Sequence, residues 1–190
     1  MKILVTSFGS FLKNNINPSL ECMNELPEFI NGFRIFKCEL PVSYIDSQVA
    51  LLHKIVEVKP DIVISLGLAV GRKTIALESE AINLIDSKFP DNNGVIFENR
   101  IINENSEYIL KTSYDLQKIK NDLNDKYEFI SISNSAGTYV CNTVYYLSLL
   151  NQEKNKYKGI FIHLPKYDVI DKKIMINALI DIIKELIFYY

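Results

Sequence analysis

Short apolar runs alternate with helical patterns along most of this 190-residue chain, and that alternation restricts the folds it can adopt. Residues 61–66 form a predominantly apolar run, which is typical of a strand buried on both faces of a parallel sheet. Parallel strands need crossover connections, and helices supply them on both faces. We therefore predict an α/β fold. It is a single-domain, three-layer α/β/α architecture over 1–190, with a mostly parallel, doubly wound open sheet.

Local signals place the individual elements. Asn17 before Pro18 predicts a helix start, because asparagine caps helices and proline suits their first turn. Pro60 ends a helical pattern that begins at residue 45. We expect strands at 2–6, 33–40, 61–66, 129–133 and 159–163, and helices from 18 onward and at 45–58, 115–124, 141–151 and 171–188.

Two segments depart from the alternation. Residues 73–84 are predicted to be extended. Residues 88–113 form a polar, asparagine-rich excursion, in which Asn92-Asn93-Gly94 is a strong turn signal and predicts a hairpin.

Cys141 is the first candidate for chemistry. It follows the predicted strand 129–133 and opens an apolar helical stretch, so it lies at a loop-to-helix junction. Free N–H groups and the helix dipole at such a junction favour the thiolate, the nucleophilic form of cysteine. Most single cysteines are small core residues, and we interpret Cys22 and Cys38 in that way.

A nucleophilic thiol needs a base, and the chain has only two histidines. His53 lies near the polar edge of a helical pattern, where a solvated histidine is expected. His163 ends the apolar run 159–163 and is followed by Leu164-Pro165, so a buried strand delivers it at its carboxyl end. If strands 129–133 and 159–163 are parallel neighbours, Cys141 and His163 converge. The alternative is a hydrogen-bonded core histidine.

A third group usually orients the imidazole of such a pair. Glu78 and Glu80 are the upstream candidates, and in an extended segment both face the same side. Periodicity does not choose between them, and both are also compatible with solvent-facing positions on an edge strand.

Four blocks, in order, carry a family resemblance. Residues 134–142 resemble an SNTAGTFVCN-like block, and 161–165 resemble an FIHVP-like block. Residues 5–13 with Asn17-Pro18-Ser19 resemble VTGFxPFGG…NPS. A GxxGGR…VE…AIN…PDN block is echoed by Gly67, Gly71-Arg72, Leu77-Glu78, Ala81-Ile82-Asn83 and Pro90-Asp91-Asn92. The chain resembles pyroglutamyl peptidase I, also called pyrrolidone-carboxylate peptidase, a cysteine peptidase family.

The resemblance implies a function and a site. It implies hydrolysis of the amide bond after an N-terminal pyroglutamyl residue, with release of 5-oxoproline and without a cofactor or metal. Its register selects Glu78 as the acid, so the implied triad is Glu78, Cys141 and His163. The Cys141 N–H, assisted by Lys88, would hold the oxyanion. The implied lactam-binding residues are Phe8, Phe11, Asn17, Phe89, Tyr139 and Val140.

Departures from the family pattern lie near the expected pocket. Leu12-Lys13 replaces a glycine pair, Ser7 and Val70 each replace a glycine, Leu68 replaces a glutamine and Lys88 an arginine. Lost glycines alter loop shape, and Leu68 removes a polar group. A catalytically silent or redirected binding or scaffold protein of the same fold is therefore the alternative. A glutamine amidotransferase would instead show a G-x-C-x-G elbow and a glutamate after its histidine.

Composition excludes several other classes. A net charge of −2 and a pI near 5.8 argue against nucleic acid or an anionic membrane as partners. The first residues turn polar too soon for a signal peptide, and no apolar run reaches membrane-spanning length. Three irregularly spaced cysteines do not form a disulfide framework, so we expect a reducing, cytoplasmic location. The apolar C-terminal helix, with the family's usual assembly, predicts a homo-oligomer, a dimer or tetramer.

Overall fold

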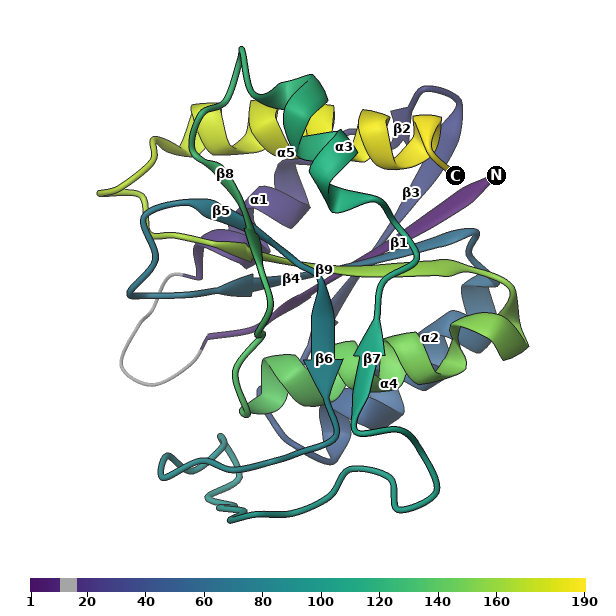
Figure 1. Ribbon diagram of the computed structural model, residues 1–190, viewed down its shortest axis with the longest axis vertical. Helices are drawn as coiled ribbons and strands as arrows, with labels where there is room; N and C mark the ends of the chain where they lie inside the picture. The colour runs from purple at the N-terminus through teal and green to yellow at the C-terminus, as the bar shows by residue number, and fades with distance from the viewer. Residues whose placement is uncertain (11–16) are drawn as a thin grey trace.

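A seven-stranded sheet forms the middle of the computed structural model, which describes residues 1–10 and 17–190. Its strands follow the order β2-β3-β1-β4-β9-β5-β8, and Figure 1 shows the sheet between two layers of helices. All five predicted strands are present within two residues of their predicted bounds. The strands of this sheet are β1 (Lys2–Phe8), β2 (Phe29–Ile30), β3 (Phe33–Leu40), β4 (Ile62–Leu68), β5 (Ile75–Glu78), β8 (Ile130–Ser133) and β9 (Lys158–Leu164).

The sheet is mostly parallel, with two antiparallel pairings: the short β2 with β3, and β5 with β9. Strands β3, β1, β4 and β9 run parallel, as predicted. Strand β5 runs antiparallel to β9 and parallel to β8. The idea that strands 129–133 and 159–163 are parallel neighbours is therefore wrong, because β5 lies between them and they run in opposite directions.

Helices cover both faces, which confirms the three-layer α/β/α prediction. In Figure 1, α1, α3 and α5 lie on one side of the sheet and α2 and α4 on the other. Two apolar cores follow: alternate residues of β9 point into each, with Ile162 in one and Phe161 in the other. The helices are α1 (Pro18–Glu25), α2 (Asp46–Val58), α3 (Leu116–Leu123), α4 (Val140–Asn155) and α5 (Lys172–Phe188).

Side-chain caps explain why several helices start where the sequence predicted. Asn17 accepts a hydrogen bond from the Ser19 N–H at the start of α1. Asp115 and Asp171 cap α3 and α5 in the same way. Helix α4 begins one residue earlier than predicted and continues to Asn155, where Lys156 adopts a left-handed conformation (φ 57°) and ends it.

The excursion after β5 differs in detail from the prediction. The extended segment 73–84 divides into β5 and β6 (Glu80–Ile82), and β6 pairs with β7 (Ile109–Lys111) in a separate two-stranded sheet. Asn92-Asn93-Gly94 does turn, since the Gly94 N–H donates to the Asp91 carbonyl at 3.0 Å. The predicted hairpin within 88–113 is wrong, because the partner of β7 lies before that range.

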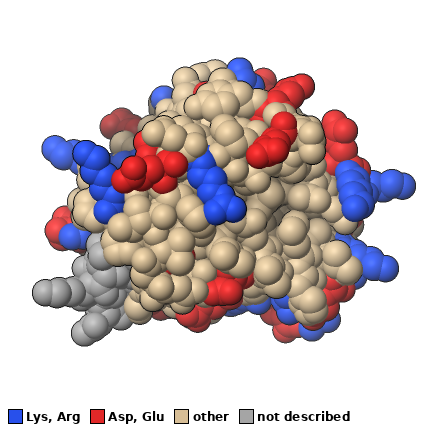
Figure 2. All heavy atoms as spheres, turned by 90° about the horizontal axis from the view of Figure 1, so that it is seen from below, with Lys and Arg blue, Asp and Glu red and all other residues tan. Residues whose placement is uncertain are grey.

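The segment between β6 and β7 forms the lowest part of the molecule in Figure 1. Figure 2 views the molecule from that side and shows a broad surface whose middle carries few charged side chains. The C-terminal helix α5 buries one apolar face against the sheet, through Met175, Leu179, Ile182 and Leu186 among others. No helix in the described part of the chain has the length and apolar character needed to cross a membrane.

Candidate active site

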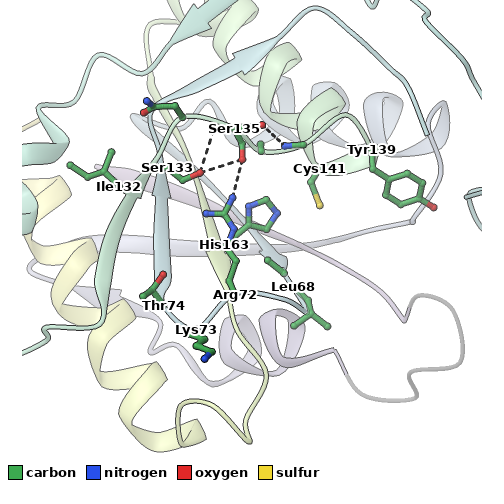
Figure 3. A pocket seen from close by; sticks show the side chains of 14 residues that line it. Leu68, Arg72, Lys73, Thr74, Ile132, Ser133, Ser135, Tyr139, Cys141 and His163 are labelled. Atoms are coloured by element: carbon green, nitrogen blue, oxygen red, sulfur yellow. Dashed lines mark hydrogen bonds between the residues drawn. The ribbon is translucent and has the colours of Figure 1, made fainter. Parts of the chain in front are cut away.

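A cavity of about 870 Å³ opens where β4, β8, β9 and the start of α4 meet. Cys141 and His163 both line it (Figure 3). Its volume falls within the range of small-molecule binding sites. The other lining residues are Leu68, Ala69, Arg72, Lys73, Thr74, Ile132, Ser133, Asn134, Ser135, Ala136, Gly137 and Tyr139.

Packing of α4 on the sheet brings Cys141 to this cavity. Gly67 on β4 is the register partner of His163 on β9. A Cβ atom at Gly67 would lie 3.2 Å from the Cys141 Sγ atom, so the first turn of α4 sits directly over that point of the sheet. The two predicted residues therefore converge through a helix packed on adjacent strands β4 and β9, and not through β8 as a neighbour of β9.

The protonation of Cys141 differs from the expectation for a helix start. Burial, and then the negative charge of Glu78, raise the pKa of the Cys141 thiol to about 12. The thiol's own backbone N–H lowers its pKa by less. The junction alone does not produce a thiolate near neutral pH, so attack by this sulfur requires a base.

His163 and Glu78 form a buried pair next to the thiol. The His163 Nδ1 atom lies 2.7 Å from Glu78 Oε1, and the side chains are 6% and 0% exposed. A carboxylate only accepts hydrogen bonds, so the geometry assigns the proton to Nδ1 and leaves Nε2 as the basic nitrogen. Glu80 lies on β6 and pairs instead with Lys111 at 3.7 Å.

Two contacts hold Glu78 in place from other elements. The Tyr145 hydroxyl on α4 donates to the Glu78 carbonyl at 2.7 Å. Arg72 Nη2 lies 2.8 Å from Glu78 Oε1 and also donates to the Ser135 carbonyl at 2.9 Å. Glu78 Oε2 is buried without a hydrogen-bond partner among the described residues. Arg72 therefore links the acid to the loop that leads into Cys141.

Arg72 is a site residue that the sequence analysis did not name as such. Its only sequence signal was its place beside Gly71 in one of the family blocks. Asn142, which follows the cysteine, was also not singled out. It accepts from the Ile82 N–H at 3.0 Å and donates to the Ile82 and Leu84 carbonyls at 2.8 and 3.0 Å, so it ties α4 to the segment after β6.

The predicted lactam-binding residues are distributed unevenly. Tyr139 lines the cavity, and its hydroxyl donates to the Pro90 carbonyl at 2.9 Å. Phe8 and Val140 are buried in the core on the α2 and α4 side. Asn17 caps α1 and donates to the Phe8 and Gly9 carbonyls. Phe89 is exposed, and Phe11 lies outside the described residues.

The other residues singled out from the sequence lie inside or outside the cavity as follows. Leu68 lines the cavity, whereas Lys88 is exposed and is not among the lining residues. Leu12 and Lys13 lie outside the described residues. His53 is exposed on α2, Cys22 is buried and Cys38 is half-buried.

Comparison with known proteins shows which family shares this sequence. The family model described as pyroglutamyl peptidase matches residues 1–179. A pyrrolidone-carboxylate peptidase of Thermosipho africanus is 40% identical over 177 residues, which cover 91% of this chain and 86% of that relative. One from Thermococcus onnurineus is 39% identical over 167 residues, with coverages of 87% and 84%.

Solved structures show the same architecture. A mutant pyrrolidone carboxyl peptidase from the hyperthermophile Pyrococcus furiosus aligns with a TM-score of 0.90 at 32% identity over 97% of both chains. The pyrrolidone carboxyl peptidase from Thermococcus litoralis aligns with a TM-score of 0.90 at 29% identity, over 96% of this chain and 91% of that one. The fold class predicted from sequence is confirmed by this agreement.

Proposed function

Because the chain belongs to the pyroglutamyl peptidase family, we propose that it hydrolyses the amide bond after an N-terminal pyroglutamyl residue, with Cys141 as the nucleophile. The products are 5-oxoproline and a peptide with a free N-terminus. One observation carries the proposal: the cavity lined by Cys141 is also lined by His163, whose Nδ1 lies 2.7 Å from the buried Glu78.

His163 acts first as a base and then as an acid. Its Nε2 takes the proton of the Cys141 thiol as the sulfur attacks the scissile carbonyl carbon. A base is needed because the raised pKa of the half-buried Cys141 thiol keeps the proton on the sulfur until attack. Glu78 holds the imidazole in the required tautomer and stabilises the imidazolium that forms.

The covalent steps then balance without a further reactant besides water. The tetrahedral intermediate expels the peptide nitrogen, which takes the proton from His163 Nε2, and a thioester with Cys141 remains. Water loses a proton to His163 and adds to the thioester carbon. The C–S bond breaks, the sulfur recovers its proton and 5-oxoproline leaves.

Main-chain N–H groups at the start of α4 are the donors best placed to stabilise the oxyanion by hydrogen bonds. Tyr139 is the N-cap residue of that helix, and its side chain makes no capping hydrogen bond, so the first-turn N–H groups are not used by a cap. We therefore assign the oxyanion to the Cys141 N–H and its neighbours. Lys88 is the weaker candidate because its side chain is exposed and does not line the cavity.

The lactam is proposed to bind on the Tyr139 side of the sulfur. Tyr139 supplies an aromatic wall there, and the buried Phe8 and Val140 support it from the core. Asn17 fixes the main chain after β1 through its two carbonyl contacts. The roles of Phe11 and Phe89 remain part of the family-based proposal.

The deciding experiment is release of a coumarin from a pyroglutamyl-amide substrate under reducing conditions. We expect turnover by the wild type, none above background by Cys141→Ala, and a loss of about 10²- to 10⁴-fold in His163→Gln. An alanyl-amide substrate serves as the matched control. If the folded wild type releases no coumarin, the peptidase proposal fails and a silent or redirected binding protein takes its place.

Two properties of the whole enzyme belong to this proposal. We place it in the reducing cytoplasm, since the reaction needs a reduced Cys141, and all three cysteines are free. We also propose a homo-oligomer of the 21.8 kDa chain, supported by the weakly charged surface in Figure 2.

A further inference from the structure

The cavity continues well beyond the space that a lactam ring needs. From Tyr139 and Cys141 it passes His163 and reaches Arg72, Lys73 and Thr74 on the far side (Figure 3). Its volume of about 870 Å³ is near the upper end for sites that hold drug-sized ligands, whereas pyroglutamate is a single five-membered ring with one carboxamide. Part of the cavity is therefore available to whatever follows the pyroglutamyl residue.

The chemistry of the proposed reaction indicates which part of the cavity holds the residue after pyroglutamate. The nitrogen that leaves must face the atom that protonates it, so the residue after the scissile bond lies on the His163 side of the sulfur. The lactam then lies on the opposite side, against Tyr139. This orientation directs the leaving peptide toward Arg72 and Lys73.

The charged residues that line this part of the cavity are positive. Two cations, Arg72 and Lys73, are among its lining residues, and none of the described lining residues is acidic. The Arg72 guanidinium already contacts Glu78 and the Ser135 carbonyl. Lys73 is exposed and has no ion-pair partner among the described residues, so its ammonium group is available to pair with a charged group of the substrate.

Polar side chains beside Lys73 add to this preference. The Ser133 hydroxyl in the lining already donates to the Ser135 carbonyl at 3.3 Å, and the Thr74 hydroxyl is hydrogen-bonded to that of Ser131 at 2.7 Å. Asn134 contributes an amide whose oxygen accepts from the Ser79 hydroxyl at 2.9 Å. Its NH₂ group has no partner among the described residues. A carboxylate that enters here meets the Lys73 cation and the N–H donors of Asn134, and none of the described lining residues is acidic.

We propose that Lys73, with Arg72 behind it, forms a leaving-group subsite that favours a carboxylate on the residue after pyroglutamate. This inference rests on the proposed function. The carboxylate has two possible sources: the free C-terminus of a dipeptide, or an aspartate or glutamate side chain in a longer peptide. Both present the same group to the same cation.

Four peptides separate the sources: pyroglutamyl-alanine, pyroglutamyl-alanine amide, pyroglutamyl-aspartate amide and pyroglutamyl-asparagine amide. We expect wild-type kcat/KM to be higher for the acid of each matched pair, by about fivefold, which is the scale of one partly exposed ion pair. A preference in only one pair identifies that source. No preference in either pair overturns the proposal.

Substitutions then test Lys73 itself. Lys73→Met should bring the acid-to-amide ratio close to one, and Lys73→Glu should invert it, while kcat/KM for the uncharged amides stays near the wild-type value. Lys154→Glu is the control with the same charge change, because Lys154 is exposed in the last turn of α4, about 20 Å along the helix from Cys141. The wild-type preference should also shrink as salt is added.

The outcomes distinguish this subsite from the catalytic proposal. If no pyroglutamyl peptide is hydrolysed, the function fails. If amides are cleaved but Lys73→Glu retains the wild-type ratio, only the subsite fails. An equal change of ratio in Lys154→Glu would also overturn it, because the effect would then come from net charge.

Discussion

Gly67 shows how one residue governs the geometry of the site. A Cβ atom at this position would lie 2.8 Å from Phe161 Cζ and 3.2 Å from Cys141 Sγ. Phe161 is fully buried, so neither it nor the sulfur can move without disturbing the core. We predict that Gly67→Ala lowers kcat/KM for a pyroglutamyl-coumarin substrate about tenfold or more and lowers the free energy of unfolding by about 1–3 kcal/mol. Steady-state kinetics and urea denaturation measure these effects.

Gly71→Ala is the matched control for this prediction. A Cβ atom there meets nothing within 4 Å, and Gly71 is not in the left-handed region. Its activity and stability should stay close to those of the wild type. Full activity of Gly67→Ala would show that the space over β4 is not needed for the position of the sulfur.

The Cys141 thiol yields a second prediction at this scale, on the pH dependence of alkylation. Its pKa is raised to about 12, mainly by burial, so a lone thiol at this position is protonated and unreactive near neutral pH. We predict that iodoacetamide labels Cys141 near neutral pH in the wild type, where His163 takes the proton. In His163→Gln the rate should become appreciable only above about pH 9 and rise with pH. Mass spectrometry of the labelled peptides measures each cysteine separately.

Cys22 and Cys38 provide internal references in the same experiment. Burial raises the pKa of Cys22 to about 11 and also raises that of Cys38, so both should label slowly near neutral pH in either protein. Fast labelling of Cys141 in His163→Gln would mean that the helix start activates the thiol by itself.

Sequence reasoning reached some site residues and missed others for physical reasons. Cys141 was named because it opens a helical pattern after a predicted strand, and His163 because it ends an apolar strand pattern; both are local signals. Glu78 and Glu80 were indistinguishable locally. The register of the family blocks selected Glu78, and in the structure the two glutamates separate because β5 ends at Glu78 and the chain then enters another sheet. Arg72 was missed as a site residue because its contacts with Glu78 and Ser135 are formed by the tertiary fold.

At the scale of elements, local sequence signals were sufficient to predict where helices and strands begin and end, but not which strands pair with each other. Caps at Asn17, Asp115 and Asp171 act within one turn, so the starts of α1, α3 and α5 were predictable. The pairing of β6 with β7 joins residues separated by the whole 83–108 segment, and no turn signal within that segment specifies it. The hairpin prediction failed for this reason.

Asp181 connects α5 to the segment before β8 and gives a prediction about pH and stability. Its burial raises the carboxyl pKa, but hydrogen bonds from Lys126, Lys184 and Tyr127 outweigh that effect and lower the pKa to about 2. A lowered pKa adds stability above the unfolded value near 4, and this stability is lost as the pH falls toward 2. We predict that Asp181→Asn costs about 1 kcal/mol at neutral pH, because partial exposure screens these contacts, and costs progressively less below about pH 4. Urea denaturation across this pH range measures the difference.

Asp125→Asn is the control for this prediction. Asp125 is exposed in the same region of the surface, and the substitution removes the same charge. It should change stability by less than about 0.5 kcal/mol at any pH. A constant penalty for Asp181→Asn from neutral pH down to pH 2 would contradict the ionic origin of the effect.

The whole molecule combines the predicted layers with a strand order that the sequence did not reveal. Alternating elements predicted a covered, mostly parallel sheet, and that is confirmed. Strand β5 follows β4 in the chain, yet it pairs on the far side of β9 and runs antiparallel to it. Hydrophobic patterns report burial and not neighbours, so such an order cannot be derived from them.

The last prediction concerns how copies of this molecule meet. The apolar C-terminal pattern predicted an interface on α5, but most of that helix's apolar surface faces the sheet. Exposed apolar side chains gather instead on α2 and the 83–108 segment: Ile45 (59%), Val49 (64%) and Ile101 (42%) line a hollow of about 280 Å³.

We predict that the wild type sediments as a multiple of 21.8 kDa and that Val49→Glu lowers the mass toward one chain. Ile174→Glu on α5, where the residue is 46% exposed, should leave the mass unchanged. If only Ile174→Glu dissociates the assembly, the interface lies on α5, and a wild type at 21.8 kDa would exclude a stable homo-oligomer.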